Sequence, residues 1–217
     1  FQRSLENIQE AEATKCVYDF ALQQLQADGR AITAKDVCVL CPYNRHKNRL
    51  RTVIAGIPEE DWNKYENFDY CAAVQDKSAS MVRRMEKVRN IDTVDKFQGS
   101  ERDVVLLNTV VQHRPDRAAD PHFINVACSR AKHLLVLVGQ LSALAQQDPT
   151  WRKIIGYGAA KMAEGEGGRE GGGSVGVAVR QFGGATEKIG RAAKWGRWGR
   201  FGRVWLRHEC SRFSKGR

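Results

Sequence analysis

Three short, nearly continuous runs of apolar residues constrain the fold of this chain more than any other feature of its sequence. They cover residues 37–41, 104–111 and 134–139, and a weaker run covers residues 90–94. None alternates apolar with polar side chains and each has the length of a strand, as expected for strands that a sheet buries on both faces. Buried helix segments have a similar composition but are usually longer. The runs therefore predict a mostly parallel sheet.

Helical patterns lie between the predicted strands. Residues 6–27 carry apolar side chains largely at helical spacing, and Gly29 follows as a stop signal. Residues 44–54 and 124–132 are shorter helix candidates. Strands that alternate with helices predict an α/β fold whose parallel strands are joined by right-handed crossovers.

The net charge of +10 is spread unevenly along the chain. Residues 1–157 hold 22 basic and 20 acidic side chains, whereas residues 180–217 hold eleven and two. Glycine is uneven too, since 16 of the 20 glycines lie from Gly156 onward. We expect one folded domain over residues 1–157 and a low-complexity tail over residues 158–217, glycine-rich first and basic afterwards. The glycine-rich part has too few apolar side chains to offset the entropy of ordering, so disorder is its expected state.

Within the predicted domain, residues 56–88 show no clear strand or helix pattern. Four aromatic side chains lie there among seven acidic residues: Trp62, Tyr65, Phe68 and Tyr70. This composition favours a surface insertion with a small apolar cluster of its own.

The sequence also bears on the cellular compartment. It has no run of 18 apolar residues, so no membrane-spanning helix is expected. The first twenty residues carry charges throughout and hold no secretory leader, and the start at Phe1 is expected to be the cut end of a longer protein. Six irregularly spaced cysteines favour a reducing compartment. We expect a nuclear or cytoplasmic protein, not a secreted one.

Cys38 and Cys41 have the spacing of metal ligands. However, they lie within an apolar strand, and no second pair follows at the distance typical of zinc sites. Buried strand cysteines behave as small apolar residues. We therefore predict no metal site in this chain.

Polar groups lie between two predicted strands in the segment TVDKFQGSERDVVLL, residues 93–107. Gly99 allows a close approach of the backbone to a ligand, while Gln98 and Glu101 offer hydrogen-bonding groups for a sugar or a base. Ligands of open α/β sheets bind at the carboxyl ends of strands, where we expect this loop. The alternative is a capped turn with solvated polar side chains.

A second polar segment, DPHFINVACSRAKHLLVLVG, covers residues 120–139. Arg130 would lie in the last turn of the helix expected over residues 124–132. A cation there could stabilise the helix end by about 0.3–1 kcal/mol through the helix dipole. Alternatively, its planar guanidinium could project to a phosphate, because a permanent charge suits a phosphoryl group that gains negative charge in a transition state.

Three segments together resemble a known family. In chain order they are CPYNRHKNRL, TVDKFQGSERDVVLL and INVACSRAKHLLVLVG, and they are similar to motifs IV, V and VI of the superfamily 1 helicases. The most similar branch contains the nonsense-mediated-decay helicase, senataxin and the replication helicase-nuclease. The resemblance covers roughly residues 4–157. It implies a second RecA-like domain, a three-layer α/β domain that pairs with a first one across an ATP-binding cleft.

The resemblance implies roles for individual residues. Arg130 would be the motif VI arginine finger that touches the γ-phosphate of ATP. Gly99 and Glu101 of motif V would lie near the phosphates and the ribose. Tyr43 of motif IV would approach the nucleotide or help to position the cleft.

The same resemblance places Thr93 and Lys96 against the nucleic-acid backbone, so that motif V would couple nucleotide to nucleic acid. The chain departs from the family pattern at two places. His46 stands where motif IV often has glutamine, and His122 and Phe123 replace an arginine pair before the motif VI asparagine. The second departure removes positive charge near the cleft.

Half of an ATP site is missing from the sequence. No GxxxxGK[ST] loop occurs, and no glycine is followed by lysine. That loop cradles the phosphates of ATP, and its hydroxyl and an acidic partner hold Mg²⁺. We therefore predict the C-terminal half of an ATP-dependent DNA or RNA helicase. Its partners would be RNA or single-stranded DNA and the first RecA-like domain of the same parent protein, which would bring the Walker motifs and the Mg²⁺ ligands. The chain alone is not expected to hydrolyse ATP.

The basic tail carries a repeated triplet, WGRWGRFGR, which begins at Trp195. Arginine charge and aromatic stacking could bind RNA or single-stranded DNA there, through Trp195, Arg197, Trp198, Arg200 and Phe201. This gives an alternative function, a non-catalytic nucleic-acid-binding module that retains the helicase fold. The other interpretation of the basic tail is a solvated segment without a function.

Overall fold

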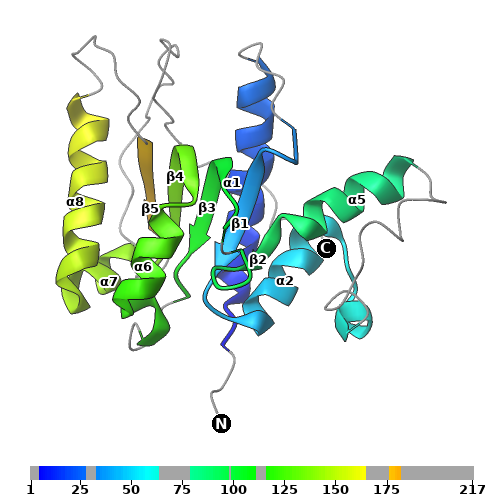
Figure 1. Ribbon diagram of the computed structural model, residues 1–217, viewed down its shortest axis with the longest axis horizontal. Coiled ribbons are helices and arrows are strands. Elements are labelled where there is room, and N and C mark those ends of the chain that lie inside the picture. Colours follow the sequence, from blue (N-terminus) through cyan, green and yellow to red (C-terminus); the bar gives the residue numbers. More distant parts are fainter. Residues whose placement is uncertain are drawn as a thin grey trace, which may run out of the picture.

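The computed structural model describes residues 5–27, 33–63, 79–97, 99–110, 116–164 and 176–181. Five strands form one sheet in the order β2-β1-β3-β4-β5, and every neighbouring pair is parallel. The strands are β1 (Val37–Cys41), β2 (Ile91–Thr93), β3 (Arg102–Asn108), β4 (Ala131–Gly139) and β5 (Gly176–Gln181). The predicted α/β fold with a parallel sheet is confirmed (Figure 1).

Helices cover both faces of this sheet (Figure 1). α1 (Ile8–Ala27) and α2 (Asn44–Ala55) pack on one face, and α6 (Pro121–Cys128), α7 (Leu141–Gln147) and α8 (Pro149–Glu164) pack on the other. α5 (Ala79–Arg89) lies beside α2, and two 3-10 turns, η1 (Glu59–Asp61) and η2 (Asp116–Ala119), lie in connections. None of the helices in the described ranges is long and apolar enough to cross a membrane. The arrangement has the three layers of a RecA-like domain.

β1 shows why its residues form a strand at the centre of the domain. Val37, Val39 and Cys41 pack with α1 and α2. Cys38 and Leu40 point to the opposite face and pack with the layer that contains α6. All five residues are fully buried. Because side chains alternate between the faces of a sheet, a strand covered on both sides is apolar at every position.

The helix predicted over residues 124–132 begins and ends earlier than the prediction. α6 starts at Pro121, and the side chain of Asp120 caps it by accepting a hydrogen bond from a backbone N–H of the first turn at 2.8 Å. The helix ends before Arg130, and β4 begins at Ala131. The predicted range was wrong because the Asp-Pro start signal outweighs apolar spacing in fixing where the helix begins. Arg130 therefore lies in the turn between helix and strand.

The domain boundary predicted after residue 157 falls inside α8, which runs to Glu164. Residues 176–181 of the predicted tail form β5, which pairs with β4 at the edge of the sheet. The apolar stretch of β5 was hidden in the sequence by the glycines that precede it. The rest of the predicted tail lies outside the described residues.

Part of the insertion predicted over residues 56–88 is α5, the helix that leads into β2. Two of its side chains form a small core with residues at the end of α2: Met85, Val88, Ala55 and Ile57. Trp62 packs against this core. The other three aromatic residues of the predicted cluster lie outside the described ranges: Tyr65, Phe68 and Tyr70.

Candidate functional site

The motif V segment, residues 94–101, runs from the side of the sheet where the strands end to the side where they begin. We call these two sides the carboxyl edge and the amino edge. The segment leaves the carboxyl end of β2 and enters the amino end of β3, and β1 lies between these two strands. The segment has to run back along the length of β1, which is about 16 Å at about 3.3 Å per residue. Connections between parallel strands usually need a dozen residues or more, often a helix. This connection is therefore unusually short.

Two side chains anchor the segment to the core. Val94 and Phe97 are buried in the layer between the sheet and α6. The N–H of Phe97 donates to the Thr93 carbonyl at 3.1 Å, and the N–H of Ser100 donates to the Phe97 carbonyl at 3.2 Å. Gly99 has a φ of +84°, and nothing lies within 4 Å of the position that a Cβ would take. Backbone conformation therefore requires glycine here, and the space beside it is open.

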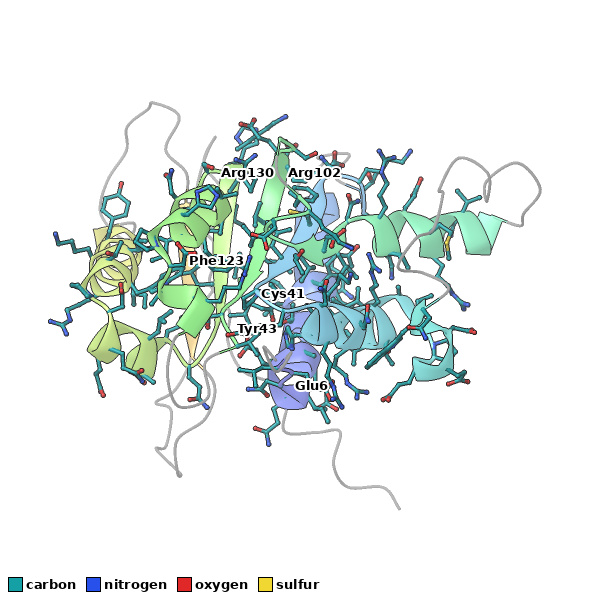
Figure 2. All side chains as sticks on the ribbon, turned by 60° about the horizontal axis from the view of Figure 1, so that its bottom comes forward. Glu6, Cys41, Tyr43, Arg102, Phe123 and Arg130 are labelled. Atoms are coloured by element: carbon teal, nitrogen blue, oxygen red, sulfur yellow. The ribbon has the colours of Figure 1, made fainter. Side chains whose placement is uncertain are left out.

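Gly99, Glu101 and Arg130 meet at the amino edge of β3 and β4. The prediction that Gly99 and Glu101 lie at the carboxyl ends of strands was wrong, because the segment starts at the end of β2 but places these two residues just before the start of β3. Arg130 Nη1 donates to the Ser100 carbonyl at 3.3 Å, and the Arg130 carbonyl accepts from the N–H of Arg102 at 3.0 Å. Gly99 and Glu101 are exposed, and Arg130 is half-buried. Figure 2 shows Arg130 and Arg102 at this edge. The structure thus brings together three of the four residues predicted to bind nucleotide.

The guanidinium of Arg130 is held by three hydrogen bonds, and some of its N–H donors have no partner among the described residues. Nε donates to the Val126 carbonyl near the end of α6 at 2.9 Å, and Nη2 donates to Ser129 Oγ at 3.3 Å. With the bond to Ser100, three of the five N–H donors have partners among the described residues. One N–H remains on each of Nη1 and Nη2, which suits two oxygens of one phosphate. The helix-end role that the sequence offered as an alternative is present, and it leaves these donors available.

Tyr43 lies at the opposite, carboxyl edge of the sheet. It follows β1 directly and precedes α2, close to Cys41 (Figure 2). The structure does not bring it together with Arg130. Thr93, the last residue of β2, lies at this same edge but is only 5% exposed, whereas Lys96 is exposed. The remaining predicted contacts lie outside the described residues: Trp195, Arg197, Trp198, Arg200 and Phe201.

A buried polar cluster lies behind the carboxyl edge, and the sequence analysis missed it. Its members are 1% exposed or less: Glu10, Thr14, His46, Asn108 and Thr109. Thr14 Oγ1 lies 2.7 Å from Asn108 Oδ1, and His46 Nε2 lies 3.3 Å from the same oxygen. Glu10 Oε1 accepts the N–H of Val110 at 3.0 Å. These contacts tie α1 and α2 to the end of β3.

Burial shifts two pKa values of this cluster in opposite directions. It raises the pKa of Glu10 to about 7, although N–H groups of Val110 and Thr109 favour the carboxylate. It lowers the pKa of His46 to about 4, so the imidazole is neutral at pH 7. Because His46 Nδ1 faces the N–H of Asn7 at 3.3 Å, we assign the imidazole proton to Nε2, which then donates to Asn108.

The cluster holds the turn that follows β3. Val110 has a φ of +49°, a conformation that β-branched residues rarely adopt. Gly139 lies against this turn, since a Cβ there would come within 2.2 Å of Thr109 Oγ1. A sequence signal for the cluster did exist, because Glu10 and Thr14 are polar residues one helical turn apart among the apolar positions of α1.

Cys38 and Cys41 are both buried in β1, and burial raises the pKa of each thiol to about 12. Metals bind the thiolate, which these surroundings disfavour. Within the described ranges, no group of three His, Cys, Asp or Glu side chains could hold a metal ion.

The family model described as "AAA domain" matches residues 2–142. The chain belongs to this family. The match includes motifs IV, V and VI, and with them every residue of the amino edge discussed above. The match ends before α8, so α8, β5 and the tail lie outside the matched part of this AAA-domain chain.

Several relatives of this AAA-domain chain carry helicase or nonsense-transcript names. The protein named "Putative ATP-dependent RNA helicase ECM32" of Saccharomyces cerevisiae is 24% identical over 158 residues, which is 66% of this chain and 14% of that protein. Regulator of nonsense transcripts 1 of Dictyostelium discoideum is 30% identical over 91 residues, 41% of this chain and 7% of that protein. The Drosophila melanogaster homologue of that regulator is 27% identical over 121 residues, 52% and 10% respectively.

These matches confirm the resemblance to superfamily 1 helicases of the nonsense-decay type. They also show that the AAA-domain chain spans 14% or less of the length of these relatives. What the relatives do as whole proteins therefore involves far more chain than is present here.

Proposed function

We propose that this chain supplies the second RecA-like domain of an ATP-dependent DNA or RNA helicase, with the amino edge of β3 and β4 facing ATP. One observation carries the proposal: the fold gathers Gly99, Glu101 and Arg130 at one edge, and two N–H groups of the guanidinium have no partner among the described residues. Arg130 then acts as an arginine finger on the γ-phosphate. An arginine placed in this way stabilises the charge that develops as the phosphoryl group is transferred.

Nucleic acid, RNA or single-stranded DNA, would lie along the carboxyl edge, against Lys96 and the backbone around Thr93. The motif V segment supports this division, because it begins at the carboxyl edge and ends at the amino edge. Its anchors Val94 and Phe97 lie in the same core as α6, which leads to Arg130. A change at the nucleotide can therefore reach the nucleic acid through one short, packed connection.

The other half of the ATP site would come from a first RecA-like domain of the parent protein. The chain has no GxxxxGK[ST] loop, and the described residues include no acidic cluster suited to Mg²⁺. The relatives are many times longer than this chain, which leaves ample room for such a domain. Bound Mg²⁺ would neutralise phosphate charge there, while Arg130 reaches the γ-phosphate from this side. Such a protein would act in the nucleus or the cytoplasm.

The test is to express the parent protein with its upstream coding region and compare it with the 217-residue chain. The longer protein is expected to hydrolyse ATP in a manner stimulated by RNA or single-stranded DNA and to separate a duplex, while the chain alone hydrolyses none. A longer protein that contains a phosphate loop but shows no nucleic-acid-stimulated hydrolysis contradicts the proposal.

The charge of the tail favours a second candidate, a non-catalytic module that keeps the helicase fold and holds nucleic acid through its basic tail. Residues 180–217 hold eleven basic and two acidic side chains, with aromatic residues between the arginines. An upstream region without a phosphate loop would favour this candidate over the enzyme.

A further inference from the structure

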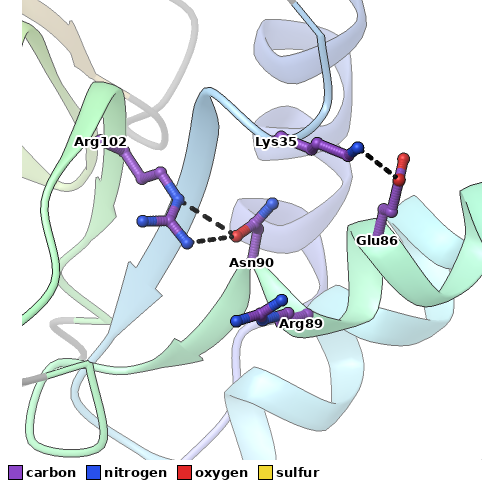
Figure 3. A pocket seen from close by; sticks show the side chains of 5 residues that line it. All are labelled: Lys35, Glu86, Arg89, Asn90 and Arg102. Carbon is purple, nitrogen blue, oxygen red and sulfur yellow. Dashed lines mark hydrogen bonds and ion pairs between the residues drawn. The ribbon is translucent and has the colours of Figure 1, made fainter. Parts of the chain in front are cut away.

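A cavity of about 250 Å³ opens at the amino edge of the sheet, beside β1, β2 and β3. Its lining comes from the start of these strands and from the end of α5: Lys35, Glu86, Arg89, Asn90 and Arg102 (Figure 3). Three of these side chains are cations and one is a carboxylate. The formal charge of the lining is therefore +2.

Asn90 fixes the guanidinium of Arg102 beside the cavity. It is 4% exposed, and its Nδ2 donates to the Ala34 carbonyl at 2.7 Å. Its Oδ1 accepts from Arg102 Nε at 3.3 Å and from Nη2 at 3.1 Å, and Arg102 Nη1 donates to the Glu101 carbonyl at 2.8 Å. These hydrogen-bond partners are all uncharged oxygens, and the guanidinium also lies over the ring of Phe97, 5.2 Å from its centre. The guanidinium is thus oriented, while its charge is not neutralised by them.

Fold stability does not account for all of this positive charge. Arg89 lies in the last turn of α5, where the helix dipole favours a cation. Lys35 and Arg102 come from other segments, so that explanation does not apply to them. Lys35 Nζ pairs with Glu86 Oε1 at 3.2 Å, but the lysine side chain is 69% exposed. Such exposed pairs add little to stability, so a ligand can compete with Glu86 for the ammonium of Lys35.

We propose that this cavity binds a phosphate monoester, the terminal phosphate of a nucleotide or of a nucleic-acid strand. A monoester carries a charge of about −1.5 to −2 at pH 7, which complements the +2 of the lining. A phosphodiester or a carboxylate carries a single charge, so the monoester matches the formal charge of the lining more closely. Arg102 retains one N–H on each of Nη1 and Nη2 for two phosphate oxygens. The inference does not depend on ATP hydrolysis by the parent protein.

The test uses the full 217-residue chain at pH 7.5 and near-physiological salt. Two pairs of ligands are titrated: an oligonucleotide with a 5′-phosphate against the same one with a 5′-hydroxyl, and adenosine monophosphate against adenosine. We expect the phosphorylated member to bind at least about tenfold more tightly, the effect of one charge-assisted hydrogen bond at the low end of its usual strength. Lys35→Gln and Arg89→Gln should each remove most of this preference, whereas Glu86→Gln, which raises the lining to +3, should increase it.

Arg84→Gln is the matched control. Arg84 is an exposed arginine on the same helix α5 and does not line the cavity, so the change in net charge is identical. Arg84→Gln should keep the preference for the phosphorylated ligand. The basic tail is the same in every variant, so it does not contribute to a difference between them. Thermal melts check that each variant is folded.

Two results would overturn the proposal: equal binding of both members of each pair by the unaltered chain, or equal loss of preference in Arg84→Gln and Arg89→Gln. The ligand pairs also separate the two sources of the phosphate. A preference seen with the oligonucleotide alone identifies a strand end, one seen with the mononucleotide alone identifies a nucleotide, and both together identify a site that reads the phosphate itself.

Discussion

Two arginines of this domain bind the end of a helix in the same way, and only one of them lies at the amino edge. Arg130 Nε donates to the Val126 carbonyl of α6. Arg152, at the start of α8, donates through Nε to the Ala145 carbonyl of α7 at 2.9 Å. The pair therefore separates what a guanidinium does for a helix end from what it does for a nucleotide.

In the parent protein, Arg130→Ala should reduce ATP turnover by about 10³-fold or more, because a missing arginine finger leaves transition-state charge unstabilised. Arg152→Ala removes a comparable helix-end contact and should leave turnover within about twofold. Turnover is measured at saturating ATP and nucleic acid, and binding of nucleic acid should hardly change in either variant. A fall of less than fivefold for a folded Arg130→Ala protein would rule out the finger role.

The buried pair Glu10 and His46 should give opposite pH dependences of stability. Glu10 has a folded pKa of about 7, above its ordinary 4.5, so its stabilising contribution is complete below pH 4.5 and is lost as the pH rises to 7. His46 has a folded pKa of about 4, below its ordinary 6.5, so its contribution is complete above pH 6.5 and is lost as the pH falls to 4. Between pH 4.5 and 6.5 the two effects oppose each other.

Removing either group should reveal the other. Relative to the unaltered protein, the free energy of unfolding of Glu10→Gln should rise by about 2 kcal/mol between pH 5 and 6.5, since one group contributes about 1.4 kcal/mol per pH unit. In His46→Gln it should fall by a similar amount. Urea unfolding at the two pH values provides the measurement. Identical pH slopes in both variants would contradict the assigned pKa shifts.

At the scale of elements, the motif V segment connects the parallel strands β2 and β3 through a short loop packed against the core, where most such connections contain a helix. Its turn depends on Gly99, whose φ of +84° disfavours any side chain although the space beside it is open. Gly56, which ends α2, has a φ of +68° and equally open space. A side chain at either glycine would meet the same unfavourable backbone conformation, so the two positions can be compared directly.

Gly99→Ala and Gly56→Ala should therefore lower the free energy of unfolding by similar amounts, about 1–2 kcal/mol, from backbone strain alone. Only Gly99→Ala should also reduce ATP turnover in the parent protein, because it shifts the loop that carries Glu101 and contacts Arg130. Denaturant unfolding and steady-state hydrolysis are compared for the two variants. Equal turnover in both would separate this loop from catalysis.

Hydrophobic pattern predicted an element well where that pattern alone sets the ends of the element. β1 has the predicted bounds, because all five of its residues are apolar and buried. α6 was misplaced because a cap, not periodicity, decides its start. The separation of Tyr43 from Arg130 was missed although a parallel sheet implies it, because Tyr43 follows one strand and Arg130 directly precedes another. The strand order, which puts β1 between β2 and β3, could not be predicted from local pattern. The contact of Glu10 with Val110 joins residues 100 positions apart and has no local signal on the β3 side.

At the scale of the whole molecule, positive charge collects after the last strand. Residues 182–217 hold ten basic and two acidic side chains, whereas residues 1–157 are nearly balanced. Since β5 ends at Gln181, a chain of residues 1–181 retains every described element and loses only this basic part. The comparison of this chain with the full one isolates the contribution of the basic part.

The full chain should bind single-stranded oligonucleotides more tightly than residues 1–181 and with a steeper dependence on salt. Six cations on phosphates would give a log–log salt slope of about −4, at about −0.7 for each contact. Replacing Trp195, Trp198 and Phe201 by alanine should remove a salt-independent part of about 1–3 kcal/mol for each stacked base. Fluorescence titrations at several salt concentrations measure both parts. Equal affinities and slopes for the two chains would show that the tail makes no contact.

The strand order has a consequence for synthesis on the ribosome. β1 lies inside the sheet, yet both of its neighbours are translated later, since Val39 pairs with Ile91 and with Leu106. At about 5–20 residues per second, the first of these partners follows after about 3–10 s. During that interval an entirely apolar strand waits with both of its backbone edges unpaired. The nascent chain is therefore most exposed to aggregation before the motif V segment emerges, and that is the stage at which a chaperone would protect it.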